Sequence, residues 1–320
     1  MPRDHVLGAV VPVGPKGHTL EFTHEAWQRP CLLDELGNVL SNYSNIVPHG
    51  MVVFFPSYAS LDMTVAQWRK TGMFDRLSKR KQVFMEPKDA KDVDTILRQY
   101  ASTVSTPPPT SPKGAMLLAV VGAKLSEGIN FQDELARCVV MVGLPFPHSQ
   151  SPELAERLAF ARSTQPPDTH SSTDPGRDLY VNMCMRAVNQ SMGRAIRHSA
   201  DYAVFLMLDQ RYGRDSILMR LPGWIRTQVQ VHERFGSSIK AVAQFFQQKK
   251  KAKGTTHTRI PTAPVSQIVS RPSCLCTFSR AFCPATLVDQ ARVLCSDPAR
   301  IPVVQARTFF RKDALYLAVI

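Results

Sequence analysis

One amide and two guanidinium groups recur at helical spacing in the segment QSMGRAIR, which runs from Gln190 to Arg197. A helix through this segment would place Gln190, Arg194 and Arg197 on one face, because they stand at positions i, i+4 and i+7. A guanidinium is always charged, and its planar fork suits phosphate oxygens. The pattern therefore predicts a site for phosphoryl-transfer chemistry. For an isolated pair of arginines, a solvated basic helix face is the alternative.

The apolar residues of the same segment predict how this helix packs. Met185, Val188, Met192 and Ile196 form a stripe roughly opposite the polar face, which is the pattern of an amphipathic helix. The stripe occupies the buried side, so the two arginines are not needed for packing.

A second polar segment follows an apolar run at 115–121. It contains Ser126, Glu127, Gly128 and Asn130. Ligands bind at the carboxyl ends of the strands in open α/β folds, and a glycine lets the backbone approach a ligand closely. Taken alone, such a loop is more often an ordinary turn than a site.

Short apolar runs alternate with helical patterns from about residue 48 onward, which predicts an α/β fold with a parallel sheet. The expected strands are 51–55, 82–85, 115–121, 137–142 and 202–208. The expected helices are 59–81, 88–100, a helix carrying the two arginines, and 237–248. Loops are expected at 102–114, which is rich in proline, and at 164–176.

The composition is that of a globular protein with a polyanionic partner. The chain is 44% hydrophobic and 20% charged, with a formal net charge of +13. Its longest apolar runs are far shorter than the roughly 18–20 residues of a membrane span, and its first residues lack the pattern of a signal peptide. We therefore expect an intracellular protein with no membrane partner. Its seven cysteines, an odd number, fit reduced thiols in the cytosol or nucleus.

The chain changes character near Lys249. Residues 251–320 hold 10 of the 39 lysines and arginines but 3 of the 26 acidic residues, and they show no sustained periodicity. We expect residues 1–250 to form one domain and residues 251–320 to form a basic tail, mostly disordered or weakly ordered, with the option of a strand at 315–320. The tail's cysteines are spaced too irregularly to favour a zinc site over free thiols. They are Cys274, Cys276, Cys283 and Cys295.

Three motifs in a fixed order carry a resemblance to a known family. They are SEGINF at 126–131, GLPFP at 143–147 and QSMGRAIR at 190–197. Together they resemble the second motor domain of the superfamily 2 iron–sulfur DNA helicases, the group that includes the XPD and FANCJ proteins. VFFPSY at 53–58 is similar to that family's motif IV, and DQRY and LPGWI follow motif VI. Asn130, where XPD-type members usually have Asp, and the run AVNQS point to the ChlR-type cohesion helicase branch.

The resemblance covers roughly residues 5–250, and it implies a RecA-like parallel sheet with helices on both faces. It also implies that Arg194 and Arg197 are catalytic arginine fingers, which reach the γ-phosphate of ATP held by a first motor domain. Gln190 and Gly193 would lie at the nucleotide. Motif V, which couples the nucleotide state to the strand contact, would supply Glu127, Gly128 and Asn130. Single-stranded DNA would contact Ser57, Tyr58 and Ser126.

The same resemblance implies ATP and Mg²⁺ as cofactors, and as partners single-stranded or forked DNA and the N-terminal half of the helicase. It further implies a nuclear location and a role in genome maintenance or sister-chromatid cohesion. The sequence contains no GxxxxGK[ST] motif, no DEAH box and no cluster of four cysteines typical of the family's iron–sulfur domain. We therefore expect half of a motor, with no metal site of its own and no ATP hydrolysis by itself.

Two alternatives stay open at this point. One is a non-catalytic nucleic-acid-binding fragment, or a truncated paralogue that lacks the P-loop domain. The other is a product that does not fold, because a single motor domain exposes the apolar surface that its partner domain would cover.

Overall fold

The chain divides into two compact units, Met1–Pro261 and Thr262–Ile320. The computed structural model describes residues 3–106, 114–125, 131, 133–148, 150–164, 174–196, 198–256, 309–311 and 314–316. In the second unit, β8 (Phe309–Arg311) pairs antiparallel with β9 (Ala314–Tyr316). The strand expected at 315–320 is described only as far as Tyr316.

The first unit is built on a seven-stranded sheet in the order β3-β4-β2-β5-β6-β1-β7. Every neighbouring pair of strands is parallel. The strands are β1 (Val6–Val10), β2 (Gly50–Phe55), β3 (Gln82–Met85), β4 (Ala115–Val120), β5 (Cys138–Val142), β6 (Ala203–Leu208) and β7 (Val229–Val231). All residues of β1, β2, β4, β5 and β6 are buried, as expected for a parallel sheet covered on both faces.

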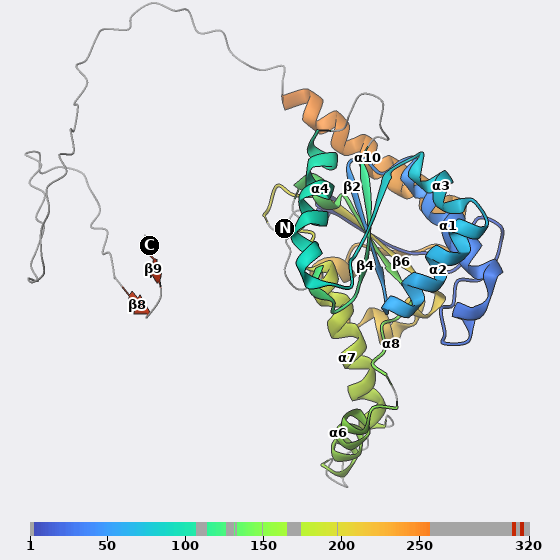
Figure 1. Cartoon of the computed structure of the whole chain (residues 1–320), viewed down its shortest axis with the longest axis vertical. Coiled ribbons are helices and arrows are strands. Elements are labelled where there is room, and N and C mark those ends of the chain that lie inside the picture. Colours follow the sequence, from blue (N-terminus) through green and yellow to red (C-terminus); the bar gives the residue numbers. More distant parts are fainter. Residues whose placement is uncertain are drawn as a thin grey trace, which may run out of the picture. The chain divides into compact units, whose positions relative to one another are not determined.

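Helices pack on both faces of this sheet (Figure 1). One apolar cluster joins the sheet to α1 (Pro30–Ser44), α2 (Tyr58–Lys70), α3 (Met73–Ser78) and α10 (Phe235–Thr256). The other joins it to α4 (Val93–Ser105), α7 (Pro175–Met192), α8 (Asp215–Leu218) and α9 (Gly223–Arg226). Alternate residues of β2 belong to the two clusters, since Val53 packs in the first and Phe54 in the second. The predicted α/β fold, RecA-like in its parallel sheet and two helical layers, is confirmed.

Several predicted boundaries are wrong. The single helix expected at 59–81 is two helices, because Gly72 has a left-handed backbone with φ of 71° and interrupts the chain between α2 and α3. The helix expected at 88–100 is preceded by a 3-10 turn, η3 (Ala90–Asp92), and continues to Ser105. Strands β1 and β7 and helix α1 were not expected. The last helix runs through residue 250 to Thr256.

Short 3-10 turns complete the first unit. They are η1 (Arg3–His5), η2 (Ala26–Gln28), η4 (Asp133–Ala136) and η5 (Gln210–Gly213). Of the helices within the described ranges, none combines the length and the apolar character that crossing a bilayer requires.

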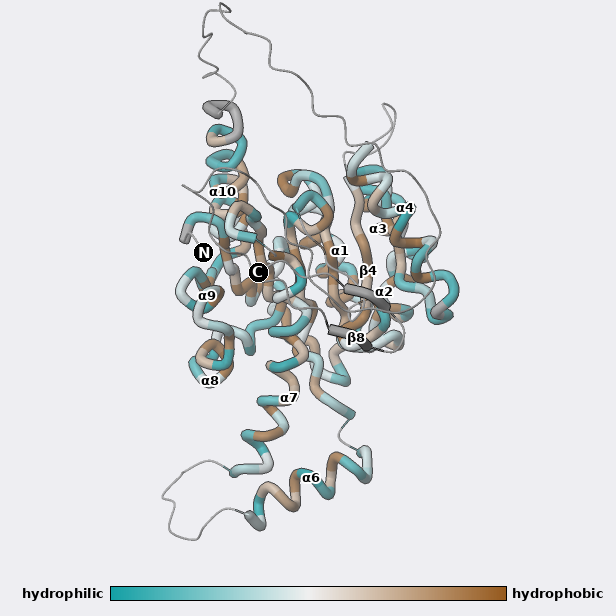
Figure 2. Tube along the Cα trace, turned by 90° about the vertical axis from the view of Figure 1, so that its left-hand side faces the viewer, coloured by the Kyte–Doolittle hydropathy of each residue, from teal (hydrophilic) through white to brown (hydrophobic). Residues whose placement is uncertain are grey.

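The helical hairpin formed by α6 (Pro152–Ser163) and α7 extends beyond the sheet (Figure 2). Arg162 of α6 joins the two helices, because its Nε and Nη2 atoms each donate to the Asp174 carboxylate at 3.0 Å. Asp174 also caps the start of α7 by accepting from the Gly176 amide at 3.0 Å. Leu154 is the buried residue of α6, so most of this helix faces solvent.

Candidate functional site

The carboxyl ends of the parallel strands meet at one edge of the sheet, and Ser57 follows β2 at this edge. Ser57 caps α2. Its hydroxyl accepts from the Ser60 amide, and its own amide donates to the Ser60 hydroxyl, each at 3.2 Å. Its side chain is otherwise exposed. A capped helix start at such an edge presents amides to an anionic ligand.

Tyr58 is half-buried, and its hydroxyl lies near the carboxylate of Glu86. Glu86 is buried and also accepts from the amides of Val120 at 2.8 Å and Leu125 at 2.9 Å. Burial raises the pKa of Glu86, and these hydrogen bonds offset only part of that rise. Burial and the nearby Glu86 raise the pKa of Tyr58 as well. Glu86 therefore links the surroundings of Tyr58 to the end of β4.

The predicted motif V residues lie outside the described residues. They are Glu127, Gly128 and Asn130, and Ser126, a predicted DNA contact, lies outside the described residues as well. The residues on either side of them are fixed. Leu125 is buried and bonded to Glu86, and Phe131 is buried with its ring 6.4 Å from that of Phe54 in an edge-on contact.

The predicted helical face of Gln190, Arg194 and Arg197 is wrong, because α7 ends at Met192. Gly193 is the C-cap residue. The Ala195 amide then bonds to the Met192 carbonyl at 3.2 Å, and the Arg194 carbonyl accepts from the Phe131 amide at 3.1 Å. These bonds take Arg194 out of the helical pattern. Arg197 lies outside the described residues.

Gln190, Gly193 and Arg194 nevertheless lie close together at the end of α7. Gln190 and Gly193 are exposed and Arg194 is half-buried. The predicted apolar stripe is confirmed at its buried positions, since Met185, Val188 and Met192 all belong to the core. An amide and a guanidinium at a helix end can both donate to phosphate oxygens, so these residues fit the nucleotide that the resemblance implied.

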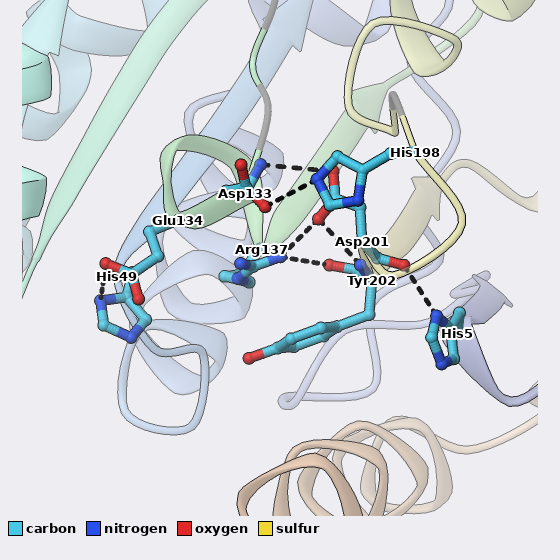
Figure 3. Close-up of polar contacts among 8 residues, drawn as sticks. All are labelled: His5, His49, Asp133, Glu134, Arg137, His198, Asp201 and Tyr202. Carbon is cyan, nitrogen blue, oxygen red and sulfur yellow. Dashed lines mark hydrogen bonds and ion pairs between the residues drawn. The ribbon is translucent and has the colours of Figure 1, made fainter. Parts of the chain in front are cut away.

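A polar cluster joins the segment before β5 to the segment before β6 (Figure 3). The buried carboxylate of Asp201 accepts from Arg137 Nη1 at 2.7 Å and from the Asp133 amide at 3.2 Å. The Asp133 side chain contacts His198 Nε2 at 3.0 Å. Asp133 precedes β5 and His198 follows QSMGRAIR, so these contacts join the segment after SEGINF to the segment after QSMGRAIR.

The residues of DQRY, at 209–212, directly follow β6 and stabilise the carboxyl ends of β5 and β6. Asp209 is fully buried and accepts from the Phe22 amide at 2.9 Å and from Arg211 Nε and Nη2, each at 2.8 Å. Burial alone would lower the pKa of Arg211, but the Asp209 carboxylate raises it above its usual value. The Tyr212 hydroxyl donates to the Gly143 carbonyl at 2.9 Å. These contacts hold the ends of β5 and β6 and are structural.

The described cysteines do not fit an iron–sulfur cluster. Cys138 and Cys184 are buried in the core, and burial raises the pKa of Cys184 to about 12 and that of Cys138 further still. A cluster ligand must be a thiolate. The remaining cysteine of the described segments, Cys31, is exposed at the start of α1. The four tail cysteines lie outside the described residues.

One group of possible metal ligands occurs among the described residues. One ligand atom each from Asp133, His198 and Asp201 lies within 4.8 Å of the others. The Asp201 oxygens are already taken by Arg137 and by the amides of Asp133 and Tyr202. A cation there would lie beside a buried guanidinium, which disfavours metal binding.

The contacts at this site include residues that sequence patterns did not identify. Glu86 and Asp201 act on residues 34 to 68 positions away along the chain. The end of α7 did carry a signal, because glycine commonly follows the last residue of a helix.

Comparisons with known proteins identify a matching family model, curated relatives and a similar solved structure. Residues 40–228 match the family model described as the Helicase C-terminal domain. The ATP-dependent DNA helicase DDX11 of Mus musculus is 46% identical over 251 residues, which cover 78% of this chain and 28% of that protein. The ATP-dependent DNA helicase chl1 of Schizosaccharomyces pombe is 40% identical over 252 residues, covering 78% and 29%. The solved structure named XPD_APO aligns with a TM-score of 0.48 and 19% identity, covering 71% of this chain and 40% of that one. The chain thus spans less than a third of the length of these two curated relatives.

Proposed function

The chain belongs to the helicase C-terminal domain family, and from this we propose that it serves as the second motor domain of an ATP-dependent DNA helicase. In this role, residues at the carboxyl edge contact one DNA strand, and residues at the end of α7 contact ATP bound to a first motor domain. The names of the curated relatives, which are ATP-dependent DNA helicases, support the substrate and the nucleotide.

The proposed catalytic residues are Arg194 and Arg197, with Gln190 and Gly193 beside the phosphates. Bound ATP, with its Mg²⁺, would supply the phosphoryl group that is transferred to water. The guanidiniums would stabilise the negative charge that develops on the γ-phosphoryl group, and the Gln190 amide would hold the arginines or the nucleotide in place. An arginine finger contributes about 10³–10⁵ in rate where it acts.

One observation carries this proposal: the hydrogen bond of 3.1 Å from the Phe131 amide to the Arg194 carbonyl. It joins the last residue of SEGINF directly to the arginine proposed as a finger. A displacement of the motif V segment by DNA would therefore shift Arg194, and closure around ATP would shift motif V. Ser57, Tyr58 and Ser126 are the proposed strand contacts, with Glu127, Gly128 and Asn130 in the coupling segment.

The test is DNA-stimulated ATP hydrolysis by two proteins. The chain alone should show no turnover above background. A chimera, in which this chain replaces the matching part of mouse DDX11, should hydrolyse ATP, and Arg194→Ala should lower its kcat by about 10³ or more. Arg194→Lys should restore little, because an ammonium lacks the planar fork.

The outcomes separate this function from the alternative of a non-catalytic nucleic-acid-binding fragment. Single-strand binding by the chain combined with an inactive chimera would favour the fragment. Turnover by the chain alone that vanished with Arg194→Ala would reveal a complete nucleotide site and exclude a half motor. A nuclear location and a role in genome maintenance or cohesion are part of the proposal, and Lys249–Lys251 with Lys253 would be the import signal.

A further inference from the structure

A groove of about 440 Å³ runs between the two helices of the α6–α7 hairpin. Its lining is mostly apolar and includes Leu179, Met183 and Ala187 of α7. Phe160 of α6 also lines it. The volume lies in the range of sites that enclose part of a small ligand, so the hairpin offers a shaped surface outside the carboxyl edge.

Phe160 is the most exposed large apolar side chain among the described residues. It is 70% exposed, whereas Met63 and Trp224 are below 40%. The sheet core does not need it, because α6 contributes Leu154 alone to the buried residues. An exposed phenyl ring in an apolar lining is a platform on which a planar group can stack.

Two arginines, Arg157 and Arg186, are the charged residues of the described segments that line the groove. Within the described part of the chain, Arg186 has no ion-pair or hydrogen-bond partner. Arg157 contacts Glu153 at 2.6 Å, but both side chains are more than half exposed, so this pair holds the guanidinium only weakly. Among the described residues, no carboxylate lines the groove. The charge of the lining therefore complements an anionic occupant.

The groove is continuous with the site described above. Its lining ends at Gln190, one turn before Arg194. The start of α7 contacts the segment after β5 at the carboxyl edge. The rings of Phe146 and Tyr180 are stacked with centroids 5.0 Å apart, and the Tyr180 hydroxyl donates to the Pro147 carbonyl at 2.8 Å. An occupant of the groove would thus be held at a fixed place relative to the proposed strand contacts.

We propose that this groove binds single-stranded DNA, with one base stacked on Phe160 and the adjacent phosphates on Arg157 and Arg186. An aromatic platform flanked by arginines is the arrangement that binds single strands without reading their sequence. The groove extends the strand path from the carboxyl edge onto the hairpin. This inference rests on the proposed function, because it assigns a further contact for the same strand.

The first experiment measures the affinity of the full chain for fluorescein-labelled oligothymidylate by anisotropy over a range of salt concentrations. Phe160→Ala should weaken binding about tenfold and leave the salt dependence unchanged. Phe160→Tyr should keep the affinity, because the ring is retained. Arg186→Ala should lower the slope of log Kd against log salt by about 0.7, which is the value for one phosphate contact on a single strand.

Two control variants match these changes in chemistry. Met219→Ala removes an apolar side chain of similar exposure (66%) outside the groove. Arg76→Ala removes an exposed arginine from α3. Both should bind like the unaltered chain. Phe160 and Arg186 are exposed, so their variants should fold normally, and a thermal melt verifies this.

The second experiment places single abasic sites along the oligonucleotide. One abasic position should weaken binding as much as Phe160→Ala does, and the two changes should not add, because both remove the same stacked pair. Additive losses at every position would overturn the proposal. Unchanged binding by Phe160→Ala would also overturn it, and would leave a protein segment as the occupant of the groove.

Failure of this inference is distinguishable from failure of the proposed function. A chain that binds oligothymidylate normally after Phe160→Ala, but poorly after Ser57→Asp, would overturn only the groove. A chain that binds no single strand at all would overturn both the groove and the strand contacts of the proposed function.

Discussion

Arg137 and Asp201 form an ion pair of 2.7 Å in which both side chains are buried, with exposed fractions of 4% and 0%. The guanidinium also lies over the ring of Tyr202, with its carbon 4.0 Å from the ring centroid. The two residues precede neighbouring strands, β5 and β6. Their pairing therefore joins the segment between SEGINF and β5 to the segment between QSMGRAIR and β6.

Asp201→Ala should destabilise the first unit strongly. The change leaves the Arg137 charge buried without its partner and removes the acceptor of the Asp133 amide. Breaking a buried pair in this way costs about 3–5 kcal/mol, measurable by urea denaturation. His198→Ala is the control, because it removes only the exposed contact with Asp133 and should stay within about 1 kcal/mol. Equal losses in the two variants would contradict this account.

Lys81 should make stability depend on pH in the alkaline range. Its ammonium is buried and donates to the His49 carbonyl at 2.7 Å, and burial lowers its pKa to about 8. Above that value the folded chain binds fewer protons than the unfolded chain, in which the lysine keeps its usual pKa of about 10.5. The contribution of Lys81 to the unfolding free energy should therefore rise by about 2 kcal/mol between pH 8 and 9.5.

The variant Lys81→Met isolates this contribution of Lys81. Burial raises the pKa of Cys138, which gives an opposite dependence at high pH, but that thiol is present in both proteins. Denaturation curves at several pH values should converge for the two proteins as the pH rises toward 9.5. A constant difference would show that Lys81 titrates normally.

Ser57 should separate helix capping from DNA binding. Ser57→Ala removes the cap of α2 and should cost about 1 kcal/mol of stability. Ser57→Asp keeps a side-chain acceptor for the Ser60 amide but places a negative charge at the proposed strand contact. It should preserve stability and weaken oligothymidylate binding several-fold at low salt. Strand affinity unchanged by the aspartate would place the DNA elsewhere.

Gly50→Ala should be among the most destabilising single methyl additions in the chain. A Cβ at Gly50 would collide with the Leu135 carbonyl oxygen and the Tyr100 hydroxyl, where β2 passes η4. Such overpacking costs roughly 1–3 kcal/mol or more. Gly236→Ala is the matched change, since a Cβ there meets no atom within 4 Å. Thermal melts of the two variants should differ by several degrees.

The sequence predicted the parts of the fold that depend on local patterns. Five strands were identifiable because each is a nearly unbroken apolar run. Strand β7 was not, because it has three residues with largely exposed side chains, and β1 was not, because Gly8 interrupts its apolar run. That glycine leaves room for β7, since a Cβ there would lie 2.7 Å from Val229 Cγ2 and the two strands would have to shift. Helix α1 did carry a readable signal in the spacing of Leu32, Leu36, Val39 and Tyr43.

Sequence patterns could nominate residues for the proposed site but could not predict how they are connected. Gln190 and Arg194 were identified from spacing, yet the helix that would have aligned them ends at Met192, because tertiary hydrogen bonds take over the Arg194 backbone. Glu86 and Asp201 belong to no motif. Their roles come from partners that only the folded chain brings near, so no window of sequence contains them.

The bond between Phe131 and Arg194 joins two main-chain atoms, so a scan of side-chain substitutions would not detect it. Replacement of either residue by alanine keeps the amide and the carbonyl. Proline at position 131 removes the donor, and an ester in place of that peptide does the same without altering any side chain. A homologue could therefore lose the arginine at the position of Arg194 and still keep the main-chain bond that fixes the backbone there.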